Sequence, residues 1–273
     1  MKKICLVLAT ASLFILLNPV RSFPEEIIRK TVFVPFSDCA DFDGSVGSPI
    51  TSAEQLVYYL GDEEVARFCV DRHFNITKKR GAVPDGAATE YFEDGQVKFR
   101  EDFKDNMRQG EAIEYFEDGK TKQLLNFLDD KLEGLRTTFY PTGRLSAEIM
   151  YKSGKQNGIA KRYFPEGNLA QESTFKDGEL NGELKTYYQN GQLQRQAIVK
   201  DNRDAGISKH YYENGQLQAE IDNDQKTISK VYYEDGSIHG IINYNENGKV
   251  VGREYDRHGN LVDEEVMDKP PSE

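Results

Sequence analysis

The sequence predicts a mainly β protein, an elongated repeat array of antiparallel β-hairpins that follows a small N-terminal helical module. Two observations predict the array. The segment GAATEYFEDG at residues 86–95 returns with few changes at residues 110, 158, 182 and 206. A glycine also recurs in steps of 24 residues five times, and then after 21 and 23 residues, at Gly95, Gly119, Gly143, Gly167, Gly191, Gly215, Gly236 and Gly259. Such a period is typical of arrays in which each unit packs on its neighbours.

Residues 1–22 have the order of a secretory signal peptide. Lys2 and Lys3 precede an apolar run, and the small residue Ser22 stands where cleavage is expected. The run from Ile4 to Leu17 holds 14 residues, which is short of the roughly 20 that a membrane-spanning helix needs. We therefore expect cleavage near Ser22 and export of a soluble chain to the periplasm or out of the cell.

Residues 23–83 predict a small module rich in helix. The segments TSAEQLVYYL (51–60) and DEEVARFCVDRHF (62–74) each suggest a short helix. Gly61 would end the first helix and Asp62 would cap the second. The two would then form a helical hairpin in front of the repeats.

Only two cysteines, Cys39 and Cys69, follow the signal peptide. In an oxidising compartment a disulfide between them is expected, and the alternative is a pair of buried thiols. We expect no metal, because the histidines are scattered. The acidic loop DCADFDGS, residues 38–45, lacks the full set of calcium ligands, although its aspartates alternate before a glycine.

The repeats fill residues 84–262 as about seven to eight units. Seven units have an aromatic pair and then a D-G, N-G, E-G or T-G dipeptide, and the last unit departs with Tyr255-Asp256. An aliphatic residue stands two positions after the glycine in all units but one. This order predicts a β-hairpin, because N-G and D-G favour a two-residue type I′ turn. A turn at Asp94 and Gly95 would place Phe92 opposite Val97, whereas a bulged loop would shift the pairing by one residue and exchange the faces.

The register of the two-residue turn predicts which side chains form the core. Period two places the following residues on the face of Phe92 and Val97: Leu125, Phe127, Ile149, Tyr151, Phe175, Ala197, Val199, Ile221, Ile242 and Tyr244. The first aromatic of each pair falls on the opposite face, among polar neighbours. We call these residues the tyrosine stripe: Tyr91, Tyr115, Phe139, Tyr163, Tyr187, Tyr211 and Tyr232.

The repeated unit G-x-x-x-x-Y-[YF]-x-[DN]-G-x-L resembles the MORN repeat in its variant form. The chain as a whole resembles bacterial proteins of the YwqK-type antitoxin family. The resemblance covers residues 84 to about 262. It implies an elongated sheet of successive hairpins, and a role in protein interaction or scaffolding instead of catalysis. The acidic residues 263–273 after the array are expected to be a disordered tail.

The net charge and the absence of catalytic motifs in the sequence exclude several classes of function. The net charge is −11, and loss of residues 1–22 removes three basic residues and no acid, which leaves −14. This charge disfavours nucleic acid and anionic membranes as partners. The residues show no catalytic triad order and no phosphate-binding loop, so we expect neither an enzyme nor a cofactor.

The leading hypothesis is an exported protein that binds, and possibly neutralises, a protein partner through the tyrosine stripe. The stripe could instead serve only to stabilise the sheet through contacts between neighbouring rings. An alternative function is an envelope scaffold that contacts lipid headgroups or glycans.

Overall fold

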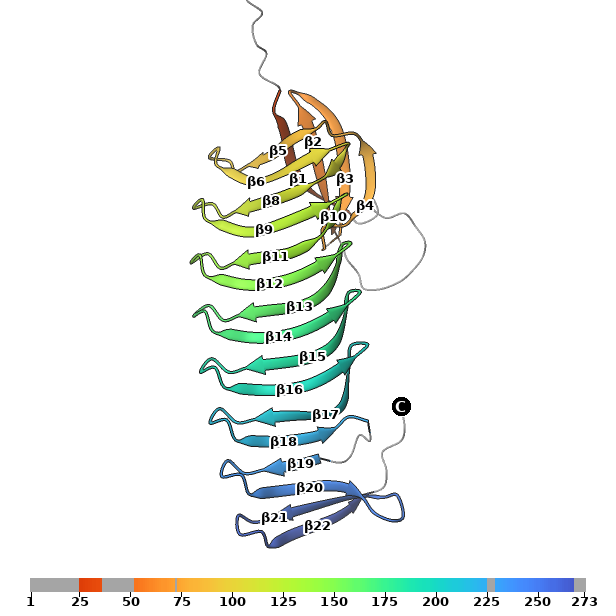
Figure 1. Ribbon diagram of the computed structural model, residues 1–273, viewed down its shortest axis with the longest axis vertical. Helices are drawn as coiled ribbons and strands as arrows, with labels where there is room; N and C mark the ends of the chain where they lie inside the picture. Colours follow the sequence, from red (N-terminus) through yellow and green to blue (C-terminus); the bar gives the residue numbers. More distant parts are fainter. Residues whose placement is uncertain (1–24, 36–51, 72, 225–228, 268–273) are drawn as a thin grey trace, which may run out of the picture.

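The computed structural model describes residues 25–35, 52–71, 73–224 and 229–267, and its regular structure in these ranges is a single sheet of 22 strands (Figure 1). The predicted signal peptide, Cys39, the acidic loop 38–45 and residues 268–273 lie outside the described residues. The predicted β-hairpin array is confirmed. The predicted helical module is wrong, because the described part of residues 23–83 forms strands and no helix.

Eight hairpins follow one another along the array, each pairing with the next in an antiparallel meander. Their strands are β5 (Gly86–Tyr91), β6 (Val97–Lys104), β8 (Gly110–Tyr115), β9 (Thr121–Leu128), β11 (Gly134–Phe139), β12 (Leu145–Lys152), β13 (Lys155–Tyr163), β14 (Leu169–Lys176), β15 (Glu179–Tyr187), β16 (Leu193–Lys200), β17 (Arg203–Tyr211), β18 (Leu217–Asp222), β19 (Ser229–Tyr232), β20 (Ile238–Tyr244), β21 (Val250–Tyr255) and β22 (Leu261–Met267). Two short strands, β7 (Met107–Arg108) and β10 (Lys131–Leu132), lead into β8 and β11.

Each hairpin closes with a three-residue loop, so the predicted two-residue turn at Asp94 and Gly95 is wrong. The amide of Gly95 donates to the carbonyl of Phe92 at 3.0 Å, and the amide of Phe92 donates to the carbonyl of Gln96 at 2.8 Å. Gly95 has a φ of +86°, which is the left-handed conformation that a type I turn with a bulged glycine requires. The same pair of hydrogen bonds recurs in all eight hairpins.

The bulge at this loop does not exchange the two faces of the sheet. Tyr91, and not Phe92, lies opposite Val97, but the register shifts at once and Glu90 lies opposite Phe99. That second pairing is the one that a two-residue turn would have given. The prediction of which residues face the core therefore holds beyond the first pair.

Two-residue turns do occur, at the opposite ends of the strands, where one unit joins the next. There both central residues have positive φ, as in a type I′ turn: Asp105 and Asn106, Asp129 and Asp130, Ser153 and Gly154, Asp177 and Gly178, and Asp201 and Asn202. Asparagine and aspartate tolerate this conformation better than other side chains do, so three of these turns have no glycine, whereas the other two contain Gly154 and Gly178.

The predicted core face is largely buried. Of its members, the buried ones are Leu125, Phe127, Ile149, Tyr151, Ala197 and Val199. Phe175, Ile221 and Tyr244 are half-buried and Ile242 is exposed, so burial falls towards the C-terminal units. We call this surface the inner face, and the surface that carries the tyrosine stripe the outer face.

The N-terminal module consists of β1 (Ile27–Pro35), β2 (Ser52–Leu60), β3 (Glu63–Val70) and β4 (Ile76–Gly81), which form an antiparallel meander. The segments expected to be helices are β2 and β3. Gly61, at a φ of +60°, and Asp62 form the turn of a two-residue hairpin, since Leu60 pairs with Glu63. Gly-Asp serves such a hairpin as well as it serves a helix boundary, and the β-branched and aromatic residues of β2 favour a strand.

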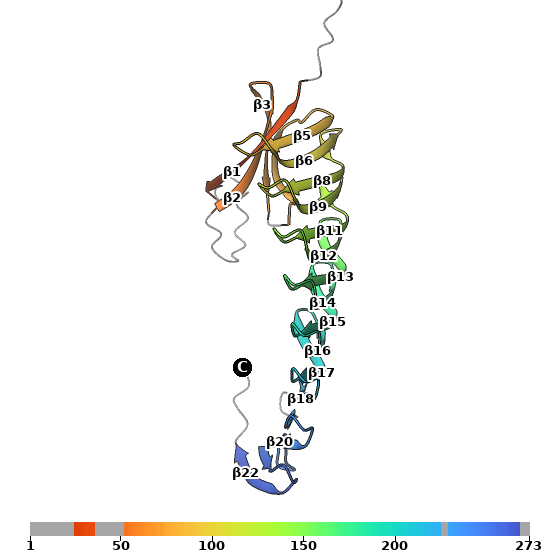
Figure 2. The same cartoon turned by 90° about the vertical axis from the view of Figure 1, so that its left-hand side faces the viewer.

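The module packs on the inner face of the first units. β1 pairs with β5 in parallel, and β2 to β4 fold back over the sheet (Figure 2). Tyr58 and Phe68 of the module form one apolar cluster with Ala88 and Phe103 of the first unit. Beyond β12 the main contacts of the described strands are with their neighbours in the sheet, and the array continues as a single layer (Figure 2). The last strand, β22, includes residues 263–267 of the predicted tail.

Candidate functional site

The outer face of the array carries three parallel rows of side chains, because every second residue of a strand points to the same side. In β13 these residues are Ile159, Lys161 and Tyr163, and in β17 they are Ile207, Lys209 and Tyr211. The rows run across the strands, since the register between units keeps equivalent residues in line. We name them the aliphatic row, the charge ladder and the tyrosine stripe.

The tyrosine stripe lies at the loop end of the strands. Each member faces the residue that stands two positions after the loop glycine, as Tyr163 faces Leu169 and Tyr187 faces Leu193. All members except Tyr91 are half-buried, and Tyr91 is 39% exposed. The rings therefore cover the sheet and also present an edge to solvent.

Hydroxyl groups of the stripe are bonded to acids on the same face. Tyr163 donates to Glu148 Oε2 at 2.7 Å, and Tyr232 donates to Glu220 Oε2 at 3.0 Å. Burial and the hydrogen bond to Glu148 raise the pKa of Tyr163 to about 12. These tyrosines stay protonated at neutral pH and act as hydrogen-bond donors, not as acids or nucleophiles.

The charge ladder is an alternation of acids and bases across neighbouring strands. Its central members are Glu148, Lys161, Glu172, Lys185, Gln196, Lys209, Glu220 and Lys230, each opposite the next. Lys161 lies 3.6 Å from Glu172, and Lys209 lies 3.3 Å from Glu220. Because exposed ion pairs contribute only about 0–1 kcal/mol, the ladder stabilises the sheet little. Its three glutamates and four lysines give these eight positions a net charge of +1.

The aliphatic row was not predicted from the sequence. It consists of Leu135, Met150, Ile159, Ile198 and Ile207. Their exposed fractions run from 38% to 57%, and Leu135 pairs directly with Met150. Leu135, Ile159 and Ile207 each follow the first glycine of a unit, so comparing that position between units would have found them.

The second aromatic of each pair has a separate, structural role. Hydroxyl groups of Tyr140, Tyr188 and Tyr212 donate to the backbone carbonyl of a stripe residue in the next unit, at 2.7, 2.8 and 2.9 Å. Tyr233 does the same to Tyr255 at 3.0 Å. These bonds join successive loops along one edge of the sheet in the four units that have a tyrosine at this position, and three other units have Phe92, Phe116 and Phe164 there.

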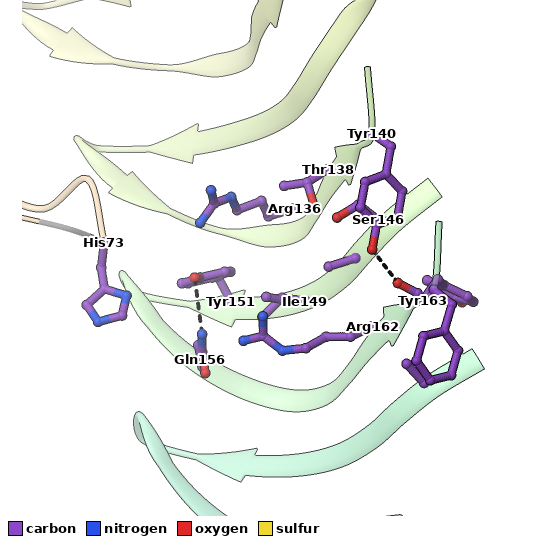
Figure 3. Close-up of a pocket in the computed structure, with 13 residues that line it drawn as sticks. His73, Arg136, Thr138, Tyr140, Ser146, Ile149, Tyr151, Gln156, Arg162 and Tyr163 are labelled. Atoms are coloured by element: carbon purple, nitrogen blue, oxygen red, sulfur yellow. Dashed lines mark hydrogen bonds between the residues drawn. The ribbon is translucent and has the colours of Figure 1, made fainter. Parts of the chain in front are cut away.

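A hollow of about 500 Å³ lies on the inner face, where the N-terminal module ends. It is formed between the loop after β3, which supplies His73, and the strands β11 to β14 (Figure 3). Tyr140, Tyr151, Phe164 and Ile149 contribute ring and aliphatic surface to its lining. Thr138, Ser146 and Gln156 contribute polar groups.

The hollow is cationic, although the chain is acidic. Arg136 and Arg162 line it, and none of its lining residues is an aspartate or glutamate. Arg136 donates from Nε and Nη2 to Gln123 Oε1 at 3.0 and 2.7 Å, and its guanidinium lies 5.2 Å from the centre of the Phe74 ring. Arg162 is exposed and makes no hydrogen bond or ion pair with another described residue.

The structure bears on the remaining predictions only in part. Among the described residues, no group of three histidine, cysteine, aspartate or glutamate side chains is placed to hold a metal ion. The same residues include no helix long and apolar enough to cross a bilayer. Cys69 is buried in β3. Because Cys39 lies outside the described ranges, the disulfide between the two stays a prediction.

Comparison with known families supports the repeat assignment. A family model described as "MORN repeat variant" matches seven segments, residues 84–105, 108–129, 132–153, 156–177, 180–201, 205–222 and 227–246. Together they cover more than half of the chain. The hairpin of β21 and β22 follows the last match. No curated protein matches the chain, so the resemblance to YwqK-type antitoxins stays a prediction.

Proposed function

The chain belongs to the MORN repeat variant family, and from this premise we propose that it is an exported, non-enzymatic protein that binds a protein partner along the outer face of its sheet. Repeats of this family are generally involved in binding proteins or membranes. The observation that carries the proposal is the aliphatic row, which exposes five large apolar side chains on one face in two groups. Leu135, Met150 and Ile159 lie on β11 to β13, Ile198 and Ile207 lie on β16 and β17, and Thr174 and Glu183 stand between the groups. Exposed apolar groups of this kind mark interaction sites on soluble proteins.

The rows on either side of the apolar residues supply the specificity that a protein interface needs. The tyrosine stripe offers rings of large area that lose little entropy on binding. The charge ladder between the two rows alternates in sign, so it can align a partner with a matching pattern of charges. An extended face of this type suits a partner that lies along several units.

A lipid bilayer fits this face less well than a protein does. Glu148, Glu172 and Glu220 lie within the ladder and offset most of the attraction of its lysines for an anionic leaflet. Apolar residues in a single row, with charged groups directly beside them, cannot enter the hydrocarbon layer without burying those charges. The scaffold that contacts lipid headgroups or glycans is therefore the second candidate.

The proposal is tested by capture of partners from the producing cell with the purified chain as bait. The test variant replaces Ile159, Ile198 and Ile207 by glutamine, which should leave the fold intact because all three are exposed. Completing the burial of each half-exposed isoleucine is worth about 1 kcal/mol. The triple variant should therefore bind a captured partner roughly 100-fold more weakly.

A matched control replaces Leu261, Val262 and Val266, which are equally exposed in β22 but belong to the end of the array. Unchanged binding of the control and loss of binding in the test variant would support the outer face. Equal binding of both variants would reject it. Sedimentation of the chain with vesicles of phosphatidylglycerol and phosphatidylethanolamine, lost in the same test variant, would instead favour the lipid scaffold. Identification of the partner as a toxin would add the neutralising role that the resemblance implies.

A further inference from the structure

The N-terminal module shows how the inner face of a unit receives an extended protein segment. Matched units begin at residues 84 and 156, so Glu90 and Arg162 hold the same position in the first and fourth units. Each lies on the inner face. Glu90 pairs with Phe99 of its own hairpin, and Arg162 pairs with Gln171 of its own hairpin and with Ala147 of the preceding unit. The two positions differ in charge and in what lies against them.

In the first unit, Glu90 is occupied by strand β1. Arg29 Nε lies 3.3 Å from Glu90 Oε2, and Thr31 donates to the same carboxylate from its amide at 3.2 Å and from its hydroxyl at 2.8 Å. Glu90 is buried as a result, and its pKa is lowered because these contacts and Lys98 outweigh the effect of burial. A β-strand with a cation at the right place therefore docks at this position of a unit.

In the fourth unit the charge at the equivalent position is reversed and its partner is missing among the described residues. Arg162 extends into the hollow, where Arg136 brings a second guanidinium from β11 (Figure 3). Arg136 is already oriented by Gln123. Two guanidinium groups in an acid-free hollow match a carboxylate, because arginine binds carboxylates through paired N–H donors.

We propose that this hollow is a carboxylate-binding site that takes an aspartate or glutamate side chain from an extended segment of a partner protein. The segment would lie across the inner face beyond the module, with its acid directed to Arg162. It would not pair with a strand edge as β1 pairs with β5, because β13 is already paired on both sides. Thr138, Ser146 and Gln156 line the same hollow and can bond the backbone of the segment. This site is on the opposite side of the sheet from the proposed outer face, and it does not depend on that proposal.

The test uses two short synthetic peptides of alternating serine and threonine that differ only in a central glutamate or glutamine. Binding to the full chain is followed by NMR, through the amides of β11 to β14 and the Nε–H signals of the arginines. We expect the glutamate peptide to shift the Arg162 signal and to bind about tenfold more tightly than its twin, as a charge-assisted hydrogen bond would give. The preference should weaken at high salt.

The decisive variant is Arg162→Gln, which removes an exposed side chain without breaking any contact described above. It should bind the two peptides equally. Arg257→Gln makes the same change of charge near the end of the array, where Arg257 is 66% exposed, and it should keep the tenfold preference. The isoleucine variant of the outer face should keep it as well.

Three outcomes would overturn the proposal. The first is equal affinity of the two peptides, or binding of neither, with the unchanged chain. The second is a glutamate preference that survives in Arg162→Gln. The third is Arg162-dependent binding of an oligogalacturonate, a carboxylate from a glycan, in the absence of peptide binding.

Discussion

Replacement of Glu101 by leucine should detach the N-terminal module from the first unit. Glu101 is 1% exposed and accepts the hydroxyl of Tyr58 at 2.8 Å, while Arg29 lies 3.3 Å away. Leu125 fills the equivalent position in the next unit and is buried as well, so a leucine fits the site sterically. The change therefore isolates the electrostatic contribution.

The expected loss of stability depends on the polar groups that stay buried after Glu101 is removed. Arg29 would keep only Glu90 as a counter-ion, and removal of one partner from a buried ion pair costs about 3–5 kcal/mol. The unpaired hydroxyl of Tyr58 adds about 1–3 kcal/mol. A loss of about 4 kcal/mol, the lower end of this sum, corresponds to exchange roughly 1,000-fold faster for the amides of β1 and β2, measured by hydrogen–deuterium exchange.

A second variant decides between the buried charge and a simple packing defect. Changing Arg29→Met and Tyr58→Phe together with Glu101→Leu leaves no unpaired charge or hydroxyl, and protection of β1 should return to within about 1 kcal/mol of the original chain. Protection that stays unchanged in Glu101→Leu alone would refute the reasoning. So would a triple variant that is less protected than the single one.

Three further outcomes are expected. Because the folded pKa of Tyr163 is about 12 against an ordinary 10, its contribution to stability is complete below pH 10 and is lost as the pH rises to 12. Tyr163→Phe should remove one phenolate that forms near pH 12 from an absorbance titration, and the step of the buried Tyr58, whose pKa is also raised, should remain. Tyr188→Phe, which leaves the carbonyl of Tyr211 without that donor, should lower the free energy of unfolding by about 1 kcal/mol, and a change below the error of urea denaturation would contradict this. Intact mass after alkylation without reductant should show Cys39 and Cys69 unmodified, whereas two added groups would disprove the disulfide.

The repeat and its faces were predictable because they depend on local chemistry that the sequence repeats. The glycine two positions before each aliphatic residue marks the position of the loop. The alternation of side chains along a strand then determines which residues are buried. The turn type was not predictable from Asp94 and Gly95 alone, since the same dipeptide ends both two-residue and three-residue hairpin loops. The compensating register shift next to the loop preserved the faces.

The N-terminal module was mispredicted because its two strands have no repeat to reveal their period. Gly61 and Asp62 carry equal weight as a helix boundary and as a hairpin turn. A signal was nevertheless present in the array. Glu101 and Arg108 stand where later units have Leu125 and Leu132, and charges at such core positions indicate that something other than the next unit covers them.

The candidate sites were predictable to different degrees. The position of the tyrosine stripe follows from the pairing pattern, but its hydrogen bonds to Glu148 and Glu220 depend on the register between units. The cationic hollow could not be found from the sequence, because Arg136 and Arg162 come from different units and are joined with His73 only by the packing of the module.

The alternation of loop types along the array also sets a distance scale. Through the first six units, a three-residue loop on one edge and a two-residue turn on the other return the chain to the same register every 24 residues. Each unit adds two strands, or about 9.6 Å. Insertion or deletion of a whole unit between the hollow and the C-terminal hairpin would change their separation by that step, while both kept their structure. A partner that contacts both would therefore bind only chains with one particular number of units.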